Sequence, residues 1–495
     1  MRATVVSSDA TGSVSGALPR LPHRAPMMSR VERNPTALIA FLCAHVVLAI
    51  LVRVQPAIAT GHAILIFMLV VWGVLRWRPL GLAFLAAYIA GTDVMWRMMH
   101  AQVPWESSKY LVAVLCLGGI LRMGRRARWH LLALVYFVAL LPSIAVVARD
   151  FQGGLSELAQ PLSFNLSGPL ALFASVWFFS QLRLTRPEVR ALMVSVIAPI
   201  ITIATIALIA TREARQLTFT DESSTATSGG FGPNQVSLVL GLGALLALLL
   251  AVDPQLKPWR RWSAFGIVLF FGVQSALTFS RGGVYSFASA FIPAAFLFWW
   301  DRSSRRWVTV LTAVLVTVAI MVVIPRLDEF TGGEFSTRFA DTNPGHRSEI
   351  VREDLRLWGE HPILGLGPGG ARLQRRGPST IAHTEYSRLL SEHGVFGLIA
   401  LVALLTICVK QLTRRQPTQE RALRIAFLFW SMASMFHVGM RIAAVSLVFG
   451  WGCARALLSR DRITPVSDPG RDVFRGTGAP LYEDWAASAS EAERR

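Results

Sequence analysis

The sequence predicts an all-α, polytopic integral membrane protein. Hydrophobic residues make up 53% of the 495 residues, charged residues only 16%, and the mean hydropathy is +0.47. A chain of this composition is too apolar for a water-soluble globule. Its many apolar runs of about 17 to 24 residues are long enough to cross a bilayer as helices. The net charge of +19 falls mainly in the connections between those runs and in the tails.

About fourteen apolar runs are candidate membrane helices. The run at 108–121 is short, and the last two runs are separated only by Met440 and Arg441. We therefore expect about 12 to 14 transmembrane helices. The candidate runs are 36–52, 56–75, 79–96, 108–121, 130–148, 162–182, 187–210, 235–252, 262–279, 282–300, 307–325, 392–409, 422–440 and 442–459.

The positions of Lys and Arg predict a cytoplasmic N-terminus. Every second connection between predicted spans is basic, as the positive-inside rule requires of cytoplasmic connections. The short connections on the other side carry one or two cations each, and the long 326–391 loop is exempt from the rule. The basic connections contain Arg76 and Arg78; Arg122, Arg125, Arg126 and Arg128; Arg183, Arg186 and Arg190; Lys257, Arg260 and Arg261; Arg302, Arg305 and Arg306; and Lys410, Arg414, Arg415, Arg421 and Arg424.

This topology divides the chain into five parts. Their composition predicts disordered cytoplasmic tails at both ends and one long extracytoplasmic loop between two groups of membrane helices. The parts are a tail at 1–34, transmembrane helices at 35–325, the loop at 326–391, transmembrane helices at 392–459 and a tail at 460–495.

The basic charge does not indicate nucleic-acid binding. Its distribution follows topology and anionic lipid headgroups, so we expect membrane lipids and no nucleic acid as partners. The four cysteines all fall inside apolar runs without metal-ligand spacing, which predicts small core side chains and no metal site. They are Cys43, Cys116, Cys408 and Cys453.

The loop at 326–391 has internal structure. Residues 347–358 place Val351, Leu355 and Trp358 on one helical face and charges on the other, which predicts an interfacial amphipathic helix. The glycine-rich stretch 361–370 follows. It is neither a Walker loop nor a dinucleotide fingerprint, and a simple tight turn explains it equally well.

Arg281 is the first candidate for chemistry. It stands in Ser280-Arg281-Gly282-Gly283 at the outer junction of two spans, and the two glycines permit close approach of a backbone or a ligand. One interpretation is a snorkelling arginine at a helix end. The other is an anion site, because the fork of guanidinium donors matches a phosphate or diphosphate.

His383 is the second candidate. It opens His383-Thr384-Glu385-Tyr386, which leads into a membrane helix. A neutral imidazole with an ordinary pKa near 6.5 can accept a proton from a hydroxyl at neutral pH. A loop histidine is more often structural, and the residues alone leave His346, His361 and His393 as competitors.

The order and placement of these segments resemble the O-antigen ligase and polymerase superfamily of bacterial inner-membrane glycosyltransferases, whose fold is all-helical. The resemblance covers roughly 211–440. Gly232-Pro233-Asn234 is similar to the family's Asn-Pro-Asn turn, with Gly in place of the first Asn. The other motifs are Ser280-Arg281-Gly282-Gly283, Arg347, the turn from Pro362 to Gly367, His383-Thr384-Glu385-Tyr386 and Glu392-His393-Gly394-Val395-Phe396-Gly397.

The resemblance implies a metal-independent, cofactor-free and inverting enzyme of the cell envelope, as in lipopolysaccharide and other polysaccharide biosynthesis. Its donor would be a glycan on undecaprenyl diphosphate, and its acceptor a hydroxyl of a glycan, lipid or protein at the periplasmic or outer face. Arg281 would be a catalytic clamp on the diphosphate, and His383 would be the catalytic base. Substrate-binding roles fall to Arg215 in preference to Arg212, and to Arg347, Glu385 and Tyr386.

Two alternatives stay open. A polymerase of the same superfamily would use the same residues and differ only in its acceptor. A transporter or flippase of lipid-linked saccharides belongs to a different class, in which ionisable groups usually lie near the membrane midplane and the two halves of the chain repeat. The predicted spans are nearly free of charge at their centres and show no internal repeat, which favours an enzyme.

Overall fold

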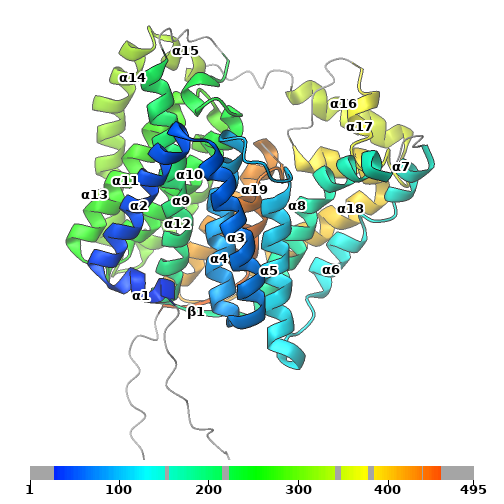
Figure 1. Cartoon of the computed structure of the whole chain (residues 1–495), viewed down its shortest axis with the longest axis horizontal. Helices are drawn as coiled ribbons and strands as arrows, with labels where there is room; N and C mark the ends of the chain where they lie inside the picture. Colours follow the sequence, from blue (N-terminus) through cyan, green and yellow to red (C-terminus); the bar gives the residue numbers. More distant parts are fainter. Residues whose placement is uncertain are drawn as a thin grey trace, which may run out of the picture.

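The protein is a bundle of membrane-length helices with a smaller group of short helices at one end (Figure 1). The computed structural model describes residues 27–150, 155–214, 222–340, 347–376, 384–437 and 439–458. Two three-residue strands, β1 (Arg183–Thr185) and β2 (Arg455–Leu457), pair in parallel, and no other strand occurs in these ranges. The all-α prediction is confirmed.

The helices follow the predicted runs closely. They are α1 (Met27–Arg33), α2 (Pro35–Val54), α3 (Ala57–Arg76), α4 (Pro79–Met98), α5 (Ser107–Met123), α6 (Leu131–Val138), α7 (Ile144–Asp150), α8 (Leu155–Gln181), α9 (Arg186–Glu213), α10 (Pro233–Val252), α11 (Pro258–Leu277), α12 (Arg281–Trp300), α13 (Arg305–Val318), α14 (Ile324–Phe330), α15 (Glu334–Ala340), α16 (Arg347–Glu360), α17 (Ala371–Gln374), α18 (Glu385–Leu412), α19 (Thr418–His437) and α20 (Ala443–Gly452). Short 3₁₀ turns lie at Gly124–Arg126 and Ala226–Ser228, and a π-helical turn at Ala319–Val323 joins α13 to α14.

Ten helices of the described ranges are long and apolar enough to cross a membrane. The helices α11 and α19 also have 20 residues but are not among these ten, and α20 has only ten residues. The polytopic membrane class is therefore confirmed. Several of the ten are longer than their predicted runs; for example, the segment of α13 and α14 continues to Phe330, and α18 begins at Glu385.

The predicted run at 130–148 is not one helix. It is divided into α6 and α7, with a turn between them in which the Ser143 hydroxyl bonds to the Leu140 carbonyl at 2.9 Å. Pro142 explains the break, because proline lacks an N–H and disfavours helical backbone at the residue before it. The prediction of a single span here was wrong.

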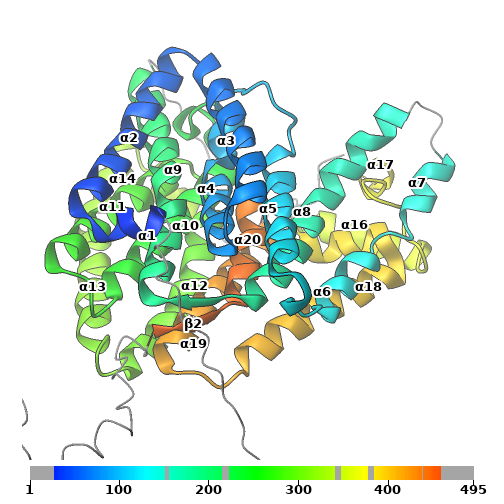
Figure 2. The ribbon, with the colours of Figure 1, turned by 60° about the horizontal axis from the view of Figure 1, so that its bottom comes forward.

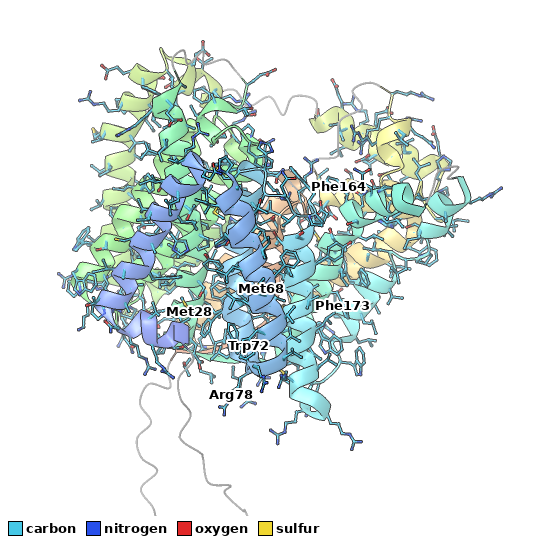
Figure 3. All side chains as sticks on the ribbon, in the orientation of Figure 1. Met28, Met68, Trp72, Arg78, Phe164 and Phe173 are labelled. Carbon is cyan, nitrogen blue, oxygen red and sulfur yellow. The ribbon has the colours of Figure 1, made fainter. Side chains whose placement is uncertain are left out.

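Burial separates the centre of the bundle from its edge. In the apolar window of α10, 94% of residues are buried, and in that of α9 83% are buried. The corresponding value for α2 is only 17%. On α3, Met68 is 63% exposed and Trp72 is 54% exposed, and both project from the outer surface of the bundle (Figure 3). Apolar side chains exposed in this way are suited to lipid tails.

The two ends of the bundle differ. Figure 1 shows α1 and β1 at one end and α14, α15, α16 and α17 at the other. Figure 3 places Arg78 at the end that carries α1, and Phe164 towards the opposite end. Because Arg78 belongs to a basic connection that we predict to be cytoplasmic, the short helices α14 to α17 lie at the end that we predict to be outside.

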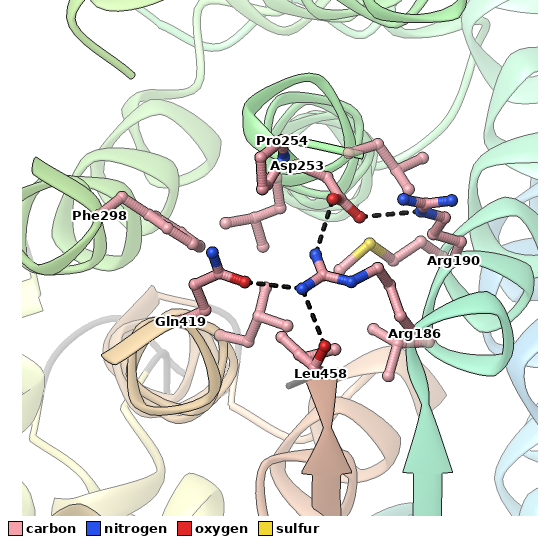
Figure 4. Close-up of a pocket in the computed structure, with 12 residues that line it drawn as sticks. Arg186, Arg190, Asp253, Pro254, Phe298, Gln419 and Leu458 are labelled. Atoms are coloured by element: carbon pink, nitrogen blue, oxygen red, sulfur yellow. Dashed lines mark hydrogen bonds and ion pairs between the residues drawn. The ribbon is translucent and has the colours of Figure 1, made fainter. Parts of the chain in front are cut away.

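A buried ion-pair cluster holds the α1 end together (Figure 4). Arg186 donates to Asp253 Oδ1 at 2.7 Å, to Gln419 Oε1 at 2.8 Å and to the Leu458 carbonyl at 3.0 Å, and Arg190 Nε donates to Asp253 Oδ2 at 2.8 Å. The cluster therefore joins α9, the end of α10, the start of α19 and the segment after β2.

Asp253 should make the stability of the protein fall as the pH becomes acidic. Burial alone raises the pKa of its carboxyl, but the hydrogen bond and charge of Arg190, together with the charge of Arg186, outweigh burial and hold the pKa below its ordinary value. A carboxyl with a lowered folded-state pKa contributes its full stability above the unfolded-state value of about 3.9, and this stability is lost as pH falls through the folded-state pKa.

We expect Asp253→Asn to lower the free energy of unfolding by about 2–4 kcal/mol at neutral pH. The difference in melting temperature between wild type and variant should shrink below about pH 4. Thermal unfolding of the detergent-solubilised protein across this range checks it. Glu329→Gln is the control, because its pair with Arg326 is exposed. Parallel melting curves for wild type and Asp253→Asn at all pH values would contradict the assignment.

A second buried pair fastens α16 to α18. Arg375 Nη2 donates to Asp354 Oδ1 at 2.6 Å, and Ser387 Oγ on α18 donates to Asp354 Oδ2 at 2.6 Å. The face of α16 that is buried holds Ile350, Asp354 and Leu357. Leu355, on the apolar face predicted from sequence, is 46% exposed, so contact between that face and a membrane surface stays a prediction.

Asp354→Ala should loosen the short helices at this end. It leaves the buried Arg375 guanidinium without its carboxylate, a loss of about 3–5 kcal/mol for a buried pair. We expect faster limited proteolysis between α16 and α18 and a lower melting temperature. Glu353→Ala is the neighbouring control, since its pair with Arg356 is partly exposed and should matter much less. Equal protease sensitivity of the two variants would contradict this role.

The glycine-rich stretch 361–370 packs against a kink in α18. Gly394 at the kink has a φ of +59°, and a Cβ there would lie 2.4 Å from the Ile363 carbonyl oxygen. Gly367 donates its N–H to the Glu392 carbonyl at 2.8 Å, and a Cβ on Gly365 would lie 2.4 Å from the Glu392 carbonyl carbon. These glycines therefore serve close backbone packing, as the tight-turn interpretation predicts.

Candidate active site

Arg281 is the first residue of α12, and the turn before it is strained. Phe279 has a φ of +57°, a conformation that non-glycine residues seldom adopt, and its side chain is fully buried with its ring 6.3 Å from that of Phe335. Arg338 of α15 donates from Nε to the Phe279 carbonyl at 3.3 Å. Two outer arginines thus flank one turn, and the N-terminus of α12 adds its partial positive charge there.

Two motifs that are separated in sequence meet at this turn. Ser280 Oγ donates to Asn234 Oδ1 at 2.7 Å, and Ser237 Oγ donates to the Ser280 carbonyl at 2.8 Å. A Cβ on Gly283 would lie 2.1 Å from the Ser237 carbonyl oxygen. The sequence left open whether the glycine pair admits a backbone or a ligand. At Gly283 it is the backbone of α10 that approaches closely.

His437 is a functional candidate that the sequence did not single out. It ends α19, and its Cβ would lie 3.4 Å from a Cβ on Gly282, the residue after Arg281. Its ring centroid is 6.0 Å from that of Tyr285. The sequence held no signal for this contact, because 156 positions separate His437 from Arg281 and no motif surrounds it.

Glu385 and Tyr386, the first two residues of α18, bond to α19 and to the turn that follows it. Tyr386 Oη donates to the Met432 carbonyl of α19 at 2.8 Å. Glu385 Oε2 accepts the Met440 N–H at 3.4 Å, and Glu385 also forms an ion pair with Arg388. Both predicted residues are thus buried or half-buried and bonded within the protein, which favours positioning over direct contact with substrate.

The turn that joins α19 to α20 is held by buried charged groups from three other helices. Asp93 of α4 accepts the Ala443 N–H at 2.9 Å, and Lys109 of α5 donates to the Met440 carbonyl at 3.3 Å. Glu385 of α18 accepts the Met440 N–H. The segments around Arg281 and Glu385, about a hundred residues apart, therefore converge on the end of α19 and this turn.

A further buried pair connects this turn to α10. Arg97 Nε donates to Asp93 Oδ1 at 3.0 Å, and Arg97 Nη1 donates to Gln235 Oε1 at 3.1 Å. Gln235 follows Asn234, the partner of Ser280. Hydrogen bonds thus run from the start of α12, through α10 and α4, to the α19–α20 turn.

An apolar cavity of about 340 Å³ opens beside Gly283. Almost all of its lining is aliphatic or aromatic, from α10, α11, α12, the α13–α14 segment and α15. Phe335 and Phe339 of α15 close one side, and Arg338 lies between them in sequence. The cavity can hold a hydrocarbon chain whose polar head lies near Arg281 and Arg338.

The remaining predicted site residues are less constrained. His383 and Arg215 lie outside the described residues, so their roles stay predictions. Arg347 begins α16, but its side chain is not among those described. Arg212 is exposed on the last turn of α9, next to Glu213, which pairs with Arg53 at 2.7 Å.

The competing histidines differ in access. His393 is fully buried with Nδ1 2.5 Å from Ser143 Oγ, which indicates a structural role in holding the α6–α7 turn to α18. His361 is exposed after α16, and His346 lies outside the described residues. Within the described ranges, no group of three or more His, Cys, Asp or Glu side chains could hold a metal ion.

One family model matches the chain. It describes the O-antigen ligases, and its match covers residues 266–402, from α11 through the Arg281 turn and the short helices into α18. No functionally curated protein matches the chain at a significant level. The match includes Arg281, Glu385 and Tyr386, and it implies a membrane enzyme of the glycosyltransferase type. Residues 266–402 of the chain are thus similar to the O-antigen ligases.

Proposed function

We propose that this protein transfers a glycan from an undecaprenyl-diphosphate carrier to an acceptor hydroxyl at the periplasmic face of the bacterial inner membrane, as an O-antigen ligase does. The observation that carries the proposal is the convergence of the Arg281 turn and the first turn of α18 on the end of α19. The apolar cavity beside Gly283 supports it, since a carrier of this kind needs room for a hydrocarbon chain next to a cationic head site.

In this reaction the acceptor oxygen attacks the anomeric carbon as the bond from that carbon to the diphosphate oxygen breaks. The bonding electron pair leaves with the polyprenyl diphosphate, and the acceptor proton passes to His383. Arg281 stabilises the negative charge that develops on the leaving group, and Arg338, which bonds to the same turn, is a candidate for a second donor. Attack opposite the leaving group inverts the configuration. Arg215, Arg212 and Arg347 remain candidates for further contacts to the diphosphate.

The test is transfer by the purified protein in nanodiscs, supplied with a polyprenyl-diphosphate-linked glycan and candidate lipid, glycan and protein acceptors. Product formation with release of polyprenyl diphosphate supports the proposal. A product extended by the donor's own repeat unit identifies a polymerase. Movement of the lipid-linked glycan across sealed vesicles with no product would overturn the proposal in favour of a transporter.

A further inference from the structure

A second cavity, of about 620 Å³, lies beside the first turns of α18. Its walls come from α8, the Gly369 turn, α17 and α18. Figures 1 and 2 both show α16 and α17 beside one end of α8 and next to α18. The lining includes Gln160, Phe164, Asn165, Arg372, Arg388 and Glu392.

The buried polar groups of this cavity are fixed in place. Arg388 is buried, and its Nη1 donates to Asn165 Oδ1 at 3.0 Å and to Glu392 Oε2 at 3.0 Å. Asn165 Nδ2 donates to the Pro161 carbonyl at 2.8 Å, so its amide orientation is set from both sides. A preformed cavity wall of this kind loses little side-chain entropy when a ligand binds.

The charges of the cavity lining and its ion-pair partners balance when the exposed Arg372 is included: three arginines, at 372, 375 and 388, stand against three carboxylates, at 354, 385 and 392. The buried Arg388 is matched by Glu385 and Glu392, and the buried Arg375 is matched by Asp354. Amide, guanidinium and carboxylate groups together provide both donors and acceptors. The half-buried ring of Phe164 supplies an apolar surface beside them. Both kinds of group are needed for a sugar ring, whose hydroxyls donate and accept and whose C–H face is apolar.

Arg388 links this cavity to the proposed reaction centre. Its guanidinium lies between Glu392, which lines the cavity, and Glu385, which bonds to the α19–α20 turn. The two cavities differ in their lining: the one beside Gly283 is almost entirely apolar, whereas this one carries amide, guanidinium and carboxylate groups.

We propose that the cavity lined by Gln160, Phe164, Asn165, Arg388 and Glu392 binds the acceptor as a neutral, hydroxyl-rich saccharide. This inference rests on the proposed function. The donor chain would occupy the apolar cavity beside Gly283, and the acceptor sugar would present one hydroxyl towards the start of α18. The transfer step itself is unchanged: the acceptor oxygen gains the glycosyl bond and loses its proton as the diphosphate departs.

The test blocks the cavity mouth without touching the core. Gln160 is exposed, so Gln160→Trp adds bulk where folding tolerates it. The matched control is Ala159→Trp, the adjacent exposed position of α8 that does not line the cavity. Each variant is expressed in source cells that lack the wild-type chain, so that the natural donor and acceptor are present. Glycoconjugate product and accumulated lipid-linked donor are measured. Binding of radiolabelled polyprenyl diphosphate to the purified variants is measured separately.

We expect Gln160→Trp to reduce product about tenfold or more, with accumulation of the lipid-linked donor and unchanged binding of polyprenyl diphosphate. Ala159→Trp should match wild type. Normal product formation by Gln160→Trp would overturn the acceptor cavity while leaving the proposed function intact. Failure of wild type to bind polyprenyl diphosphate or to form product would instead count against the proposed function.

Discussion

Arg281→Ala should reduce glycan transfer about 10²- to 10³-fold, the usual loss when one donor to a developing negative charge is removed. Arg281→Lys should recover only part of it, because an ammonium lacks the fork that bonds two phosphate oxygens at once. The side chain is half-buried at the N-terminus of α12, where its charge is less screened than in bulk water. Transfer by each purified variant in nanodiscs, at saturating donor, measures the effect.

Arg326→Ala is the matched control for Arg281. It removes an arginine from the same end of the bundle, but one that is 78% exposed and paired with Glu329 at the surface. Wild-type transfer by Arg326→Ala together with loss in Arg281→Ala would tie the effect to the Arg281 turn. Equal losses in both variants would indicate a general dependence on outer charge and would contradict a specific clamp.

His383→Gln should cause a loss of about 10²- to 10⁴-fold, because general-base catalysis contributes that much. Glutamine keeps hydrogen-bonding capacity and removes the titratable nitrogen. The pH–rate profile of wild type should show an ascending limb as the base loses its proton, and this limb should be absent from the residual activity of the variant.

A parallel experiment on His437 distinguishes between two histidines as the catalytic base. It is the described histidine that packs against Gly282, so it is the alternative source of a proton-accepting group near Arg281. His437→Gln should retain the ascending limb if His383 is the base. Loss of the limb in His437→Gln and its retention in His383→Gln would transfer the role to His437. His361→Gln, at an exposed position outside both cavities, serves as the control.

Much of the fold could be predicted from sequence because lipid imposes simple rules. Length and apolarity mark helices such as α9 and α10 directly, and no tertiary information is needed to find them. The rules failed at Pro142, where one apolar run contains a break, and at Glu385, where α18 begins before its apolar segment. The charged residues Glu385, Arg388 and Glu392 make the first turns of α18 look like a polar loop in the sequence. Their ion pairs with one another, which allow them to be buried, are seen only in the structure.

The sequence singles out only some residues of the candidate site, for a similar reason. Short motifs reveal Arg281, Glu385 and Tyr386, but motifs carry no record of what lies between them in space. His437, Asn165 and the pair of Asp93 and Arg97 come from helices outside the motif segments, and their contacts depend on packing angles that no spacing rule encodes. Gly283 illustrates the limit: its need for close approach is readable, but whether a ligand or α10 approaches is not.

The α19–α20 turn has a consequence for the order in which substrates act. Its backbone is bonded to α4, α5 and α18, and its helix abuts the residue after Arg281. Two binding sites whose neighbouring residues both contact this region cannot respond independently when it moves. If occupancy of the donor site shifts the turn, affinity for the acceptor changes by some factor, and linkage requires the acceptor to change donor affinity by the same factor. Donor and acceptor titrations, each carried out with and without the other, would therefore yield one shared coupling free energy.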